Sequence, residues 1–135
     1  YDGMRGQAGG CPLPLFALQR FGKWFHGRHA KSQVEGATVY LWDDAFVRYY
    51  DSHVGRAAVH VLEHLGFDVR LLQQHGCCGR PSFSQGDLRR ARRLGRSNVA
   101  YILDHLEAPL LFLEPSCLSM FVQEYMALGL SLIQL

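Results

Sequence analysis

Short apolar runs alternate along this chain with longer segments in which apolar residues recur at helical spacing. Three of the runs are rich in β-branched, aromatic or leucine residues and are bounded by polar residues or glycine, which is typical of buried strands. They span residues 37–42, 67–72 and 109–113, and a fourth run at residues 131–135 has the same character. The pattern therefore predicts a sheet of three to four strands.

Helical periodicity occupies the intervals between these runs. In residues 53–65 the predicted inward stripe consists of Val54, Ala57, Ala58, Val61, Leu62 and Leu65. A capping box at residues 84–87 opens a second helix, whose stripe consists of Leu88, Ala91, Gly95, Val99, Ile102 and Leu106. Ser116 is expected to cap a last helix, with Leu118, Phe121, Val122 and Tyr125 inward. Gly66 and Gly129 are expected to end the first and the last of these helices.

The resulting order is β-α-β-α-β-α, which indicates an α/β fold with a mostly parallel sheet flanked by helices. In such folds, ligands bind beyond the carboxyl ends of the strands. Three segments with chemically interesting side chains directly follow the predicted strands: residues 43–45, 73–83 and 114–117. We therefore expect these segments to meet at one edge of the sheet.

The two ends of the chain differ in character. Residues 1–36 contain a glycine-rich, linker-like stretch and one short helical pattern at residues 16–25, which we expect to pack on the main body. Residues 37–135 carry the alternating pattern and form the predicted α/β domain. Because the first residue is Tyr1, we expect the chain to be part of a longer protein.

Composition narrows the classes of function. With 135 residues the chain is long enough for one domain with a real core, and no run of about 18 apolar residues suggests a membrane span. A formal charge of +2 is too small to indicate a nucleic-acid partner. Four cysteines without a visible secretory signal favour a reducing compartment and a metal or redox role.

The cysteines are the strongest chemical signal. Cys77 and Cys78 are adjacent, and adjacent cysteines suit a metal or cluster better than a disulfide, because one turn presents two thiolates to one ion. Cys117 follows the third predicted strand, whereas Cys11 lies in the linker-like stretch. Soft thiolate sulfur selects iron–sulfur clusters, zinc or copper. We therefore predict a cofactor or metal site formed by Cys77, Cys78 and Cys117.

Four stretches of the sequence resemble one known family. They are Val54-Gly55-Arg56-Ala57-Ala58, Cys77-Cys78-Gly79-Arg80-Pro81, Ser84-Gln85-Gly86 and Glu114-Pro115-Ser116-Cys117. Over roughly residues 20–128 the chain resembles the cysteine-rich CCG domain. This domain occurs in the heterodisulfide reductase B subunit, the glycolate oxidase iron–sulfur subunit, lactate-utilisation proteins and large FAD-linked oxidases. The resemblance is closest to the FAD-linked oxidase version.

The chain departs from the family motif at two of five cysteine positions. The motif has a lone cysteine, then the pair, then C-x-x-C; Ala45 and Glu114 stand where the lone cysteine and the first cysteine of C-x-x-C would be. In heterodisulfide reductase relatives the complete motif holds an iron–sulfur cluster. The resemblance here implies an iron–sulfur site with three cysteine ligands, completed by a carboxylate such as Glu114 or by an outside ligand.

The resemblance also implies a function and partners. It suggests a redox or electron-transfer module of an FAD-linked 2-hydroxy-acid dehydrogenase of the lactate or glycolate type, or of a related iron–sulfur oxidoreductase. The partners would be an FAD-binding oxidase domain and a ferredoxin-like domain, with FAD held outside this chain. A cytoplasmic location follows, with peripheral association at the inner face of the membrane as an option. The isolated domain is not expected to turn over substrate.

Several alternatives stay open at this point. Cys77, Cys78 and Cys117 could hold zinc with His75 or Glu114 as a fourth ligand, in a structural domain. The chain could instead be a cluster-free module that docks flavin and ferredoxin domains. His60, Glu63 and His64 match the H-x-x-E-H peptidase motif, but their helical positions place them on a flank and away from the core. Five arginines at positions 89, 90, 92, 93 and 96 form a solvated face or a docking surface for an acidic partner.

Overall fold

The computed structural model describes residues 15–29, 36–72 and 75–130. Its sheet has three strands in the order β2-β1-β3, and they are β1 (Thr38–Trp42), β2 (Asp68–Leu71) and β3 (Leu110–Phe112). Both strand pairs are parallel, with Thr38 opposite Asp68 and Tyr40 opposite Leu110. The predicted α/β fold with a parallel sheet is therefore confirmed, while the fourth run at residues 131–135 lies outside the described residues.

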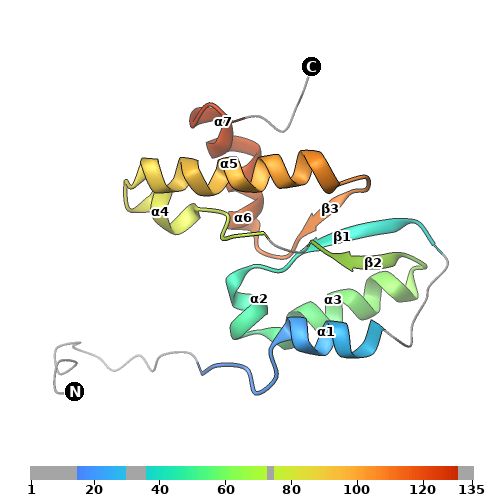
Figure 1. The fold of residues 1–135 in the computed structure, drawn as a ribbon. Coiled ribbons are helices and arrows are strands. Elements are labelled where there is room, and N and C mark those ends of the chain that lie inside the picture. Colours follow the sequence, from blue (N-terminus) through green and yellow to red (C-terminus); the bar gives the residue numbers. More distant parts are fainter. Residues whose placement is uncertain (1–14, 30–35, 73–74, 131–135) are drawn as a thin grey trace, which may run out of the picture.

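Helices cover both faces of the sheet (Figure 1). One face carries α1 (Phe21–His29) and α3 (Ser52–His64), and the other carries α5 (Leu88–His105) with the C-terminal helices. The C-terminal helices are α6 (Pro115–Ser119), a π-helical turn η1 (Met120–Glu124) and α7 (Tyr125–Ala127). They follow one another directly and form one continuous helix. Two short helices, α2 (Ala45–Tyr49) and α4 (Arg80–Ser84), lie in segments for which the sequence pattern predicted no helix.

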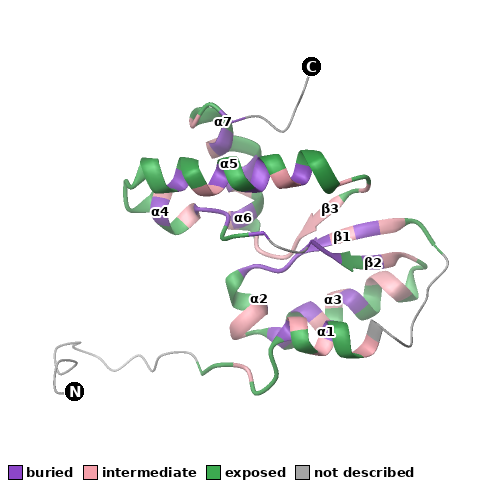
Figure 2. Ribbon diagram, in the orientation of Figure 1, coloured by how far each residue is buried: buried purple, intermediate pink, exposed green. Residues whose placement is uncertain are grey.

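The core consists of two clusters on opposite faces of the sheet, because successive side chains of a strand point to opposite sides. Val39 and Leu41 belong to the cluster beneath α1 and α3, which also contains the buried Phe21 and Phe25 of α1. Trp42 belongs to the other cluster, under α5 and the C-terminal helices. Figure 2 shows the buried stripes of the helices turned toward the sheet. The predicted packing of a short helix on the main body is thus confirmed, although this helix spans Phe21–His29 and not residues 16–25.

The inward face of α3 differs from the prediction. Val54, Val61 and Leu65 are exposed, and the buried residues of this helix are Ser52, Gly55 and Val59. A side chain at Gly55 would lie 2.5 Å from Val47 and 2.7 Å from the ring of Phe21. The helix therefore approaches closely at Gly55 and also packs through Val59 and Leu62, whereas Val54, Val61 and Leu65 face solvent.

The last helix also turns a different face inward. Leu118 and Val122 are exposed, and the buried positions are Cys117, Met120, Phe121 and Tyr125. The π-helical turn places one extra residue in the helix, so the buried face no longer follows regular helical spacing. Only part of the predicted stripe is therefore correct.

The predicted helix caps were displaced by two or three residues. Asp87, rather than Ser84, caps α5 by accepting a hydrogen bond from the Arg90 amide, and Ser84 belongs to α4. Glu114, rather than Ser116, caps α6. Gly66 and Gly129 have φ angles of 87° and 70°, as the predicted helix ends require.

Candidate functional site

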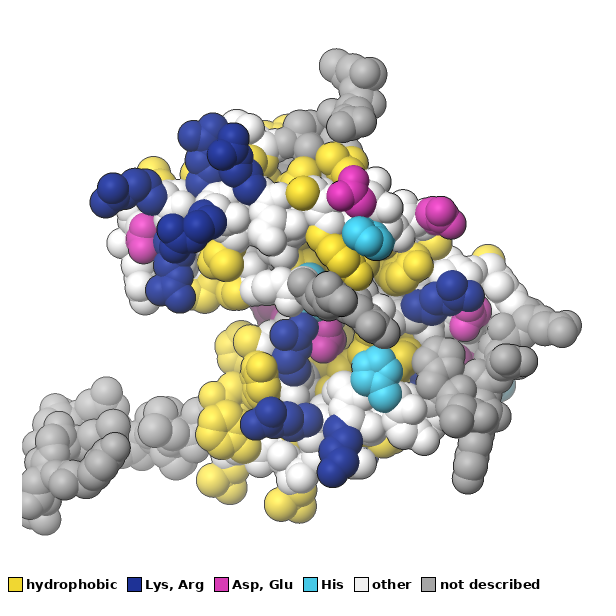
Figure 3. Space-filling model, in the orientation of Figure 1, with side chains coloured by type: hydrophobic (Ala, Val, Ile, Leu, Met, Phe, Trp, Pro, Cys, Tyr) yellow, Lys and Arg dark blue, Asp and Glu magenta, His cyan; other side chains and the backbone are white. Residues whose placement is uncertain are grey.

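A cavity of about 400 Å³ lies at the carboxyl edge of the sheet. Its lining comes from the ends of all three strands and the segments that follow them. These residues are Trp42 to Tyr49 except Val47 at β1, His75 to Cys78 with Arg80 and Pro81 after β2, and Glu114, Ser116 and Cys117 after β3. The segments meet because parallel strands end at the same edge. Figure 3 shows the surface hollowed between the upper part of the molecule, with α4 and α5, and the lower part, with α2.

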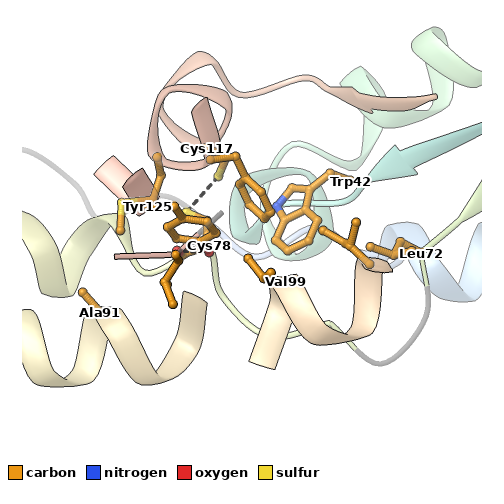
Figure 4. Packing of buried hydrophobic residues seen from close by; sticks show 11 residues of the cluster. Trp42, Leu72, Cys78, Ala91, Val99, Cys117 and Tyr125 are labelled. Atoms are coloured by element: carbon orange, nitrogen blue, oxygen red, sulfur yellow. Dashed lines mark hydrogen bonds between the residues drawn. The ribbon is translucent and has the colours of Figure 1, made fainter. Parts of the chain in front are cut away.

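All three predicted cysteines line this cavity, and all three are free thiols. The Cys117 thiol donates a hydrogen bond to the Cys78 sulfur across 3.2 Å, and both side chains are buried. Figure 4 shows these two side chains facing each other beside Tyr125. Cys77 is exposed, and its sulfur accepts a hydrogen bond from the Gly79 amide at 3.5 Å. Residues 39 positions apart are thus brought into sulfur–sulfur contact.

Both members of the adjacent pair are held in the protonated form. The hydrogen-bonded Cys117 raises the pKa of the Cys78 thiol to about 11, and burial adds to this effect. Hydrogen bonding to Cys78, followed by burial, raises the pKa of Cys77 as well. Both thiols are therefore protonated near neutral pH, and a metal that binds them would have to displace these protons.

Two buried polar side chains hold the loop that carries Cys77 and Cys78. The Asn98 amide group accepts from the Gly76 N–H at 3.2 Å and donates to the Cys77 carbonyl oxygen at 3.0 Å. The same amide nitrogen donates to the Tyr125 hydroxyl at 3.2 Å, and that hydroxyl donates to the Cys78 carbonyl oxygen at 2.7 Å. Asn98 and Tyr125 thereby tie the cysteine loop to α5 and to the helix that carries Cys117.

Asn98 was not among the predicted site residues, although one signal in the sequence was present. Asn98 lies one position before Val99 of the predicted stripe and shares the buried side of α5. It is only 1% exposed, and polar groups buried to this degree almost always have hydrogen-bond partners. A polar residue beside a predicted buried stripe was therefore a reason to expect a specific contact.

A second buried polar group adjoins the cysteines. His75 Nε2 lies 2.7 Å from Asp43 Oδ1, and Nδ1 lies 2.9 Å from the Gly76 carbonyl oxygen. Arg48 contacts both oxygens of Asp43 at 3.0 Å. The imidazole packs against Trp42, with ring centroids 3.8 Å apart and the two rings tilted by 32°. Because both ring nitrogens of His75 have partners, this residue is not free to serve as the fourth zinc ligand that the sequence suggested.

The charge of Asp43 is stabilised by these neighbours. Burial alone would raise the pKa of this carboxyl, but hydrogen bonds from His75 and Arg48 outweigh it and lower the pKa below its ordinary value. A carboxyl with a lowered native pKa stabilises the fold fully above its unfolded pKa of about 3.9. That stability is lost as pH falls through the lower native value.

We therefore expect Asp43→Asn to reduce stability most at pH 6, with the difference from the wild type shrinking as pH falls below about 4. Urea unfolding between pH 3 and pH 7 measures this difference. Asp51→Asn is the matched control, because Asp51 is exposed and makes no side-chain cap. A deficit for Asp43→Asn that stays constant across this pH range would contradict the assignment.

The two non-cysteine motif positions also line the cavity. The Glu114 carboxylate accepts a hydrogen bond from the Ser116 amide at 3.1 Å, and so serves as the cap of α6. Ala45, the first residue of α2, is exposed. Within residues 15–29, 36–72 and 75–130, no three His, Cys, Asp or Glu side chains are arranged as a ready metal site. The three thiols therefore line one cavity, but their side chains are not arranged as a ready metal site.

The H-x-x-E-H residues have no place in a metal site. Glu63 forms an ion pair with Arg28 of α1 at 2.7 Å. His60 packs edge-on against Trp24, with ring centroids 5.6 Å apart. These side chains join α3 to α1, and none of them lines the cysteine cavity. The motif match is thus explained by helix packing.

None of the helices in the described part of the chain has the length and apolar character that a bilayer-spanning helix needs.

Comparison with known proteins agrees with the cysteine pattern. The chain is 29% identical over 90 residues to the C subunit of anaerobic glycerol-3-phosphate dehydrogenase from Escherichia coli K12, covering 67% of this chain and 23% of that protein. It is 28% identical over 85 residues to lactate utilization protein A of Bacillus thuringiensis, covering 62% of this chain and 34% of that protein. No solved structure matches. The model of the CCG cysteine-rich domain matches residues 42–122, so the chain belongs to this family.

Proposed function

We propose that this chain is the cysteine-rich redox module of an iron–sulfur oxidoreductase, of the FAD-linked 2-hydroxy-acid dehydrogenase type. One relative is named as a dehydrogenase subunit and the other as a lactate utilization protein, and lactate is a 2-hydroxy acid. The chain spans only about a quarter to a third of the length of these relatives. In this proposal, the flavin site and a ferredoxin-like domain lie in other parts of the whole assembly, at the cytoplasmic side.

The observation that carries the proposal is the convergence of Cys77, Cys78 and Cys117 on one cavity. Three thiolates suit a soft metal centre, whereas a complete iron–sulfur cluster is usually held by four cysteines. The chemistry of the donor atoms therefore suits a centre with three protein thiolates and one position open to an outside ligand, and binding would require the three side chains to move closer together. It does not fit the full five-cysteine motif, because Ala45 offers no donor and Glu114 is engaged at the helix cap.

The surrounding residues would support such a centre in distinct ways. Cys77, Cys78 and Cys117 would hold the metal, which would supply one-electron transfer when bound. Asn98 and Tyr125 fix the backbone of the cysteine pair through the four hydrogen bonds described above. The buried rings of Trp42 and Phe121 keep water from the inner side of the site.

Anaerobic reconstitution with iron and sulfide tests the proposal. We expect visible thiolate-to-iron absorption in the wild type, and an affinity lower by about tenfold or more in Cys77→Ser and Cys117→Ser. Cys11→Ser is the matched control and should behave as the wild type. Equal spectra for all four proteins would remove these residues from the site. Retention of zinc, with no iron-dependent absorption, would instead support the structural zinc alternative.

A further inference from the structure

A dense group of arginines covers the exposed side of α5. Arg89, Arg90, Arg92, Arg93 and Arg96 are all exposed, and we refer to them as the arginine surface. Figure 3 shows dark-blue side chains gathered over the part of the molecule formed by α4 and α5. The whole chain has 14 basic and 12 acidic residues. Five of the 14 therefore occupy one helix of a nearly neutral chain.

These arginines have no carboxylate partner among the described residues. The ion pairs in residues 15–29, 36–72 and 75–130 involve Arg28, Arg48, Arg70, Arg80 and His75. Asp87, the acidic residue nearest in sequence, accepts a hydrogen bond from the Arg90 backbone N–H as the cap of α5. A cluster of like charges on a folded surface costs free energy through mutual repulsion. An acidic partner would relieve that repulsion.

The arginine surface borders the cysteine site. The Cys77–Gly79 loop lies directly on α5, since a side chain at Gly79 would come within 3.3 Å of the Ala91 carbonyl oxygen. Cys77 is the exposed member of the pair. Ala91 lies between Arg90 and Arg92 in α5, so the arginine surface begins next to this loop. A protein bound to the arginine surface would therefore stand beside Cys77.

We propose that the arginine surface docks an acidic face of an electron-carrying protein or domain, next to the opening of the cysteine site. The electron-carrying role of this partner rests on the proposed function, whereas its acidic character rests on the charges alone. Arginine forms bidentate pairs with carboxylates and is enriched at protein interfaces. Leu88, 49% exposed at the start of the same helix, adds an apolar contact. No exposed aromatic residue of α5 offers a stacking platform for single-stranded nucleic acid among residues 88–100.

Binding of an acidic [2Fe–2S] ferredoxin, used as a probe, tests the docking proposal on the 135-residue chain. We expect the affinity to fall by about tenfold or more in Arg89→Glu/Arg93→Glu/Arg96→Glu and to weaken with added salt. The matched control is Arg20→Glu/Lys23→Glu/Arg70→Glu, which changes the net charge equally at exposed sites elsewhere. We expect this control to lower the affinity for the ferredoxin by about twofold or less. The ferredoxin should also slow alkylation of Cys77 in the wild type and in the control only.

Several outcomes would overturn the docking proposal. Equal loss of binding in both triple variants would show that net charge alone attracts the probe. Tighter binding to a DNA duplex than to the ferredoxin at about 150 mM salt would assign the surface to nucleic acid. The metal content of each protein separates this proposal from the proposed function. Arginine-dependent docking in a protein that cannot hold metal would support the surface and refute the redox site.

Discussion

Replacing Trp42 by alanine is expected to destabilise the fold by about 3–5 kcal/mol, the cost of deleting a large buried aromatic side chain. Trp42 is 1% exposed at the end of the central strand. Its ring centroid lies 4.9 Å from that of Phe121 and 5.7 Å from that of Phe112, and the imidazole of His75 packs against it as well. The substitution would leave a void between the core and the wall of the cysteine cavity. A loss of this size is a large share of the stability of a small domain.

Chemical denaturation of Trp42→Ala, Trp42→Phe and Phe46→Ala measures this effect. The phenylalanine variant keeps an aromatic ring and should lose less than half as much stability. Phe46 also lines the cavity but is 56% exposed, so its removal should cost about 1 kcal/mol or less. Comparable losses for Trp42→Ala and Phe46→Ala would contradict the packing described for Trp42.

Asn98→Ala is expected to cost about 2–4 kcal/mol, because buried donors and acceptors that lose a partner each cost about 1–3 kcal/mol. The affected groups are the Gly76 N–H, the Cys77 carbonyl and the Tyr125 hydroxyl. We also expect the affinity for metal to fall by about tenfold, since the loop that presents Cys77 and Cys78 would no longer be held in place. Asn98 would thus act as a positioning residue.

Ser97→Ala is the matched control for Asn98→Ala, because Ser97 is exposed at the preceding position of the same helix. It should change stability by less than about 0.5 kcal/mol and leave metal affinity unaltered. The metal affinity separates a positioning role from a general loss of stability. Trp24→Ala serves as a comparison for general destabilisation, because Trp24 packs between α1 and α3 and does not line the cysteine cavity. If Asn98→Ala lowers stability but binds metal as the wild type does, the positioning role is wrong.

The strands and the helix ends could be predicted because their signals are local. Apolar runs bounded by polar residues identified β1, β2 and β3, and glycines with positive φ ended α3 and α7. The order β2-β1-β3 could not be predicted, since the alternation of elements indicates parallel strands without saying which strand is central. The short helices α2 and α4 were not predicted, because five residues are too few to show helical periodicity.

The predictions of which faces of α3 and of the last helix are buried were wrong for a different reason. A hydrophobic stripe shows which residues could be buried, whereas burial here follows the closest approach of the backbones. Gly55 permits contact with Phe21 and Val47, and that contact sets the orientation of α3. In the last helix, the π-helical turn at Met120–Glu124 shifts the register, and nothing in the apolar pattern signals such a turn.

The location of the site could be predicted from topology, whereas the hydrogen bonds that hold its residues in place could not. Segments after parallel strands meet at one edge, so the convergence of Cys77, Cys78 and Cys117 could be predicted. The contact between Asp43 and His75 joins residues 32 positions apart, and no periodic pattern indicates it. Glu114 was not predicted as the cap of α6, because Ser116, two positions later, is also a typical cap residue and precedes the same helical pattern.

The central claim is that Cys77, Cys78 and Cys117 form a thiolate site that binds a metal or an iron–sulfur cluster. Elemental analysis of protein purified under strictly anaerobic conditions tests it most directly, with Cys78→Ser as the comparison. We predict bound iron and acid-labile sulfide in the wild type and a loss of both in Cys78→Ser. The absence of iron, sulfide and zinc from both proteins, with both folded, would contradict the claim and leave this chain a docking module without a cluster.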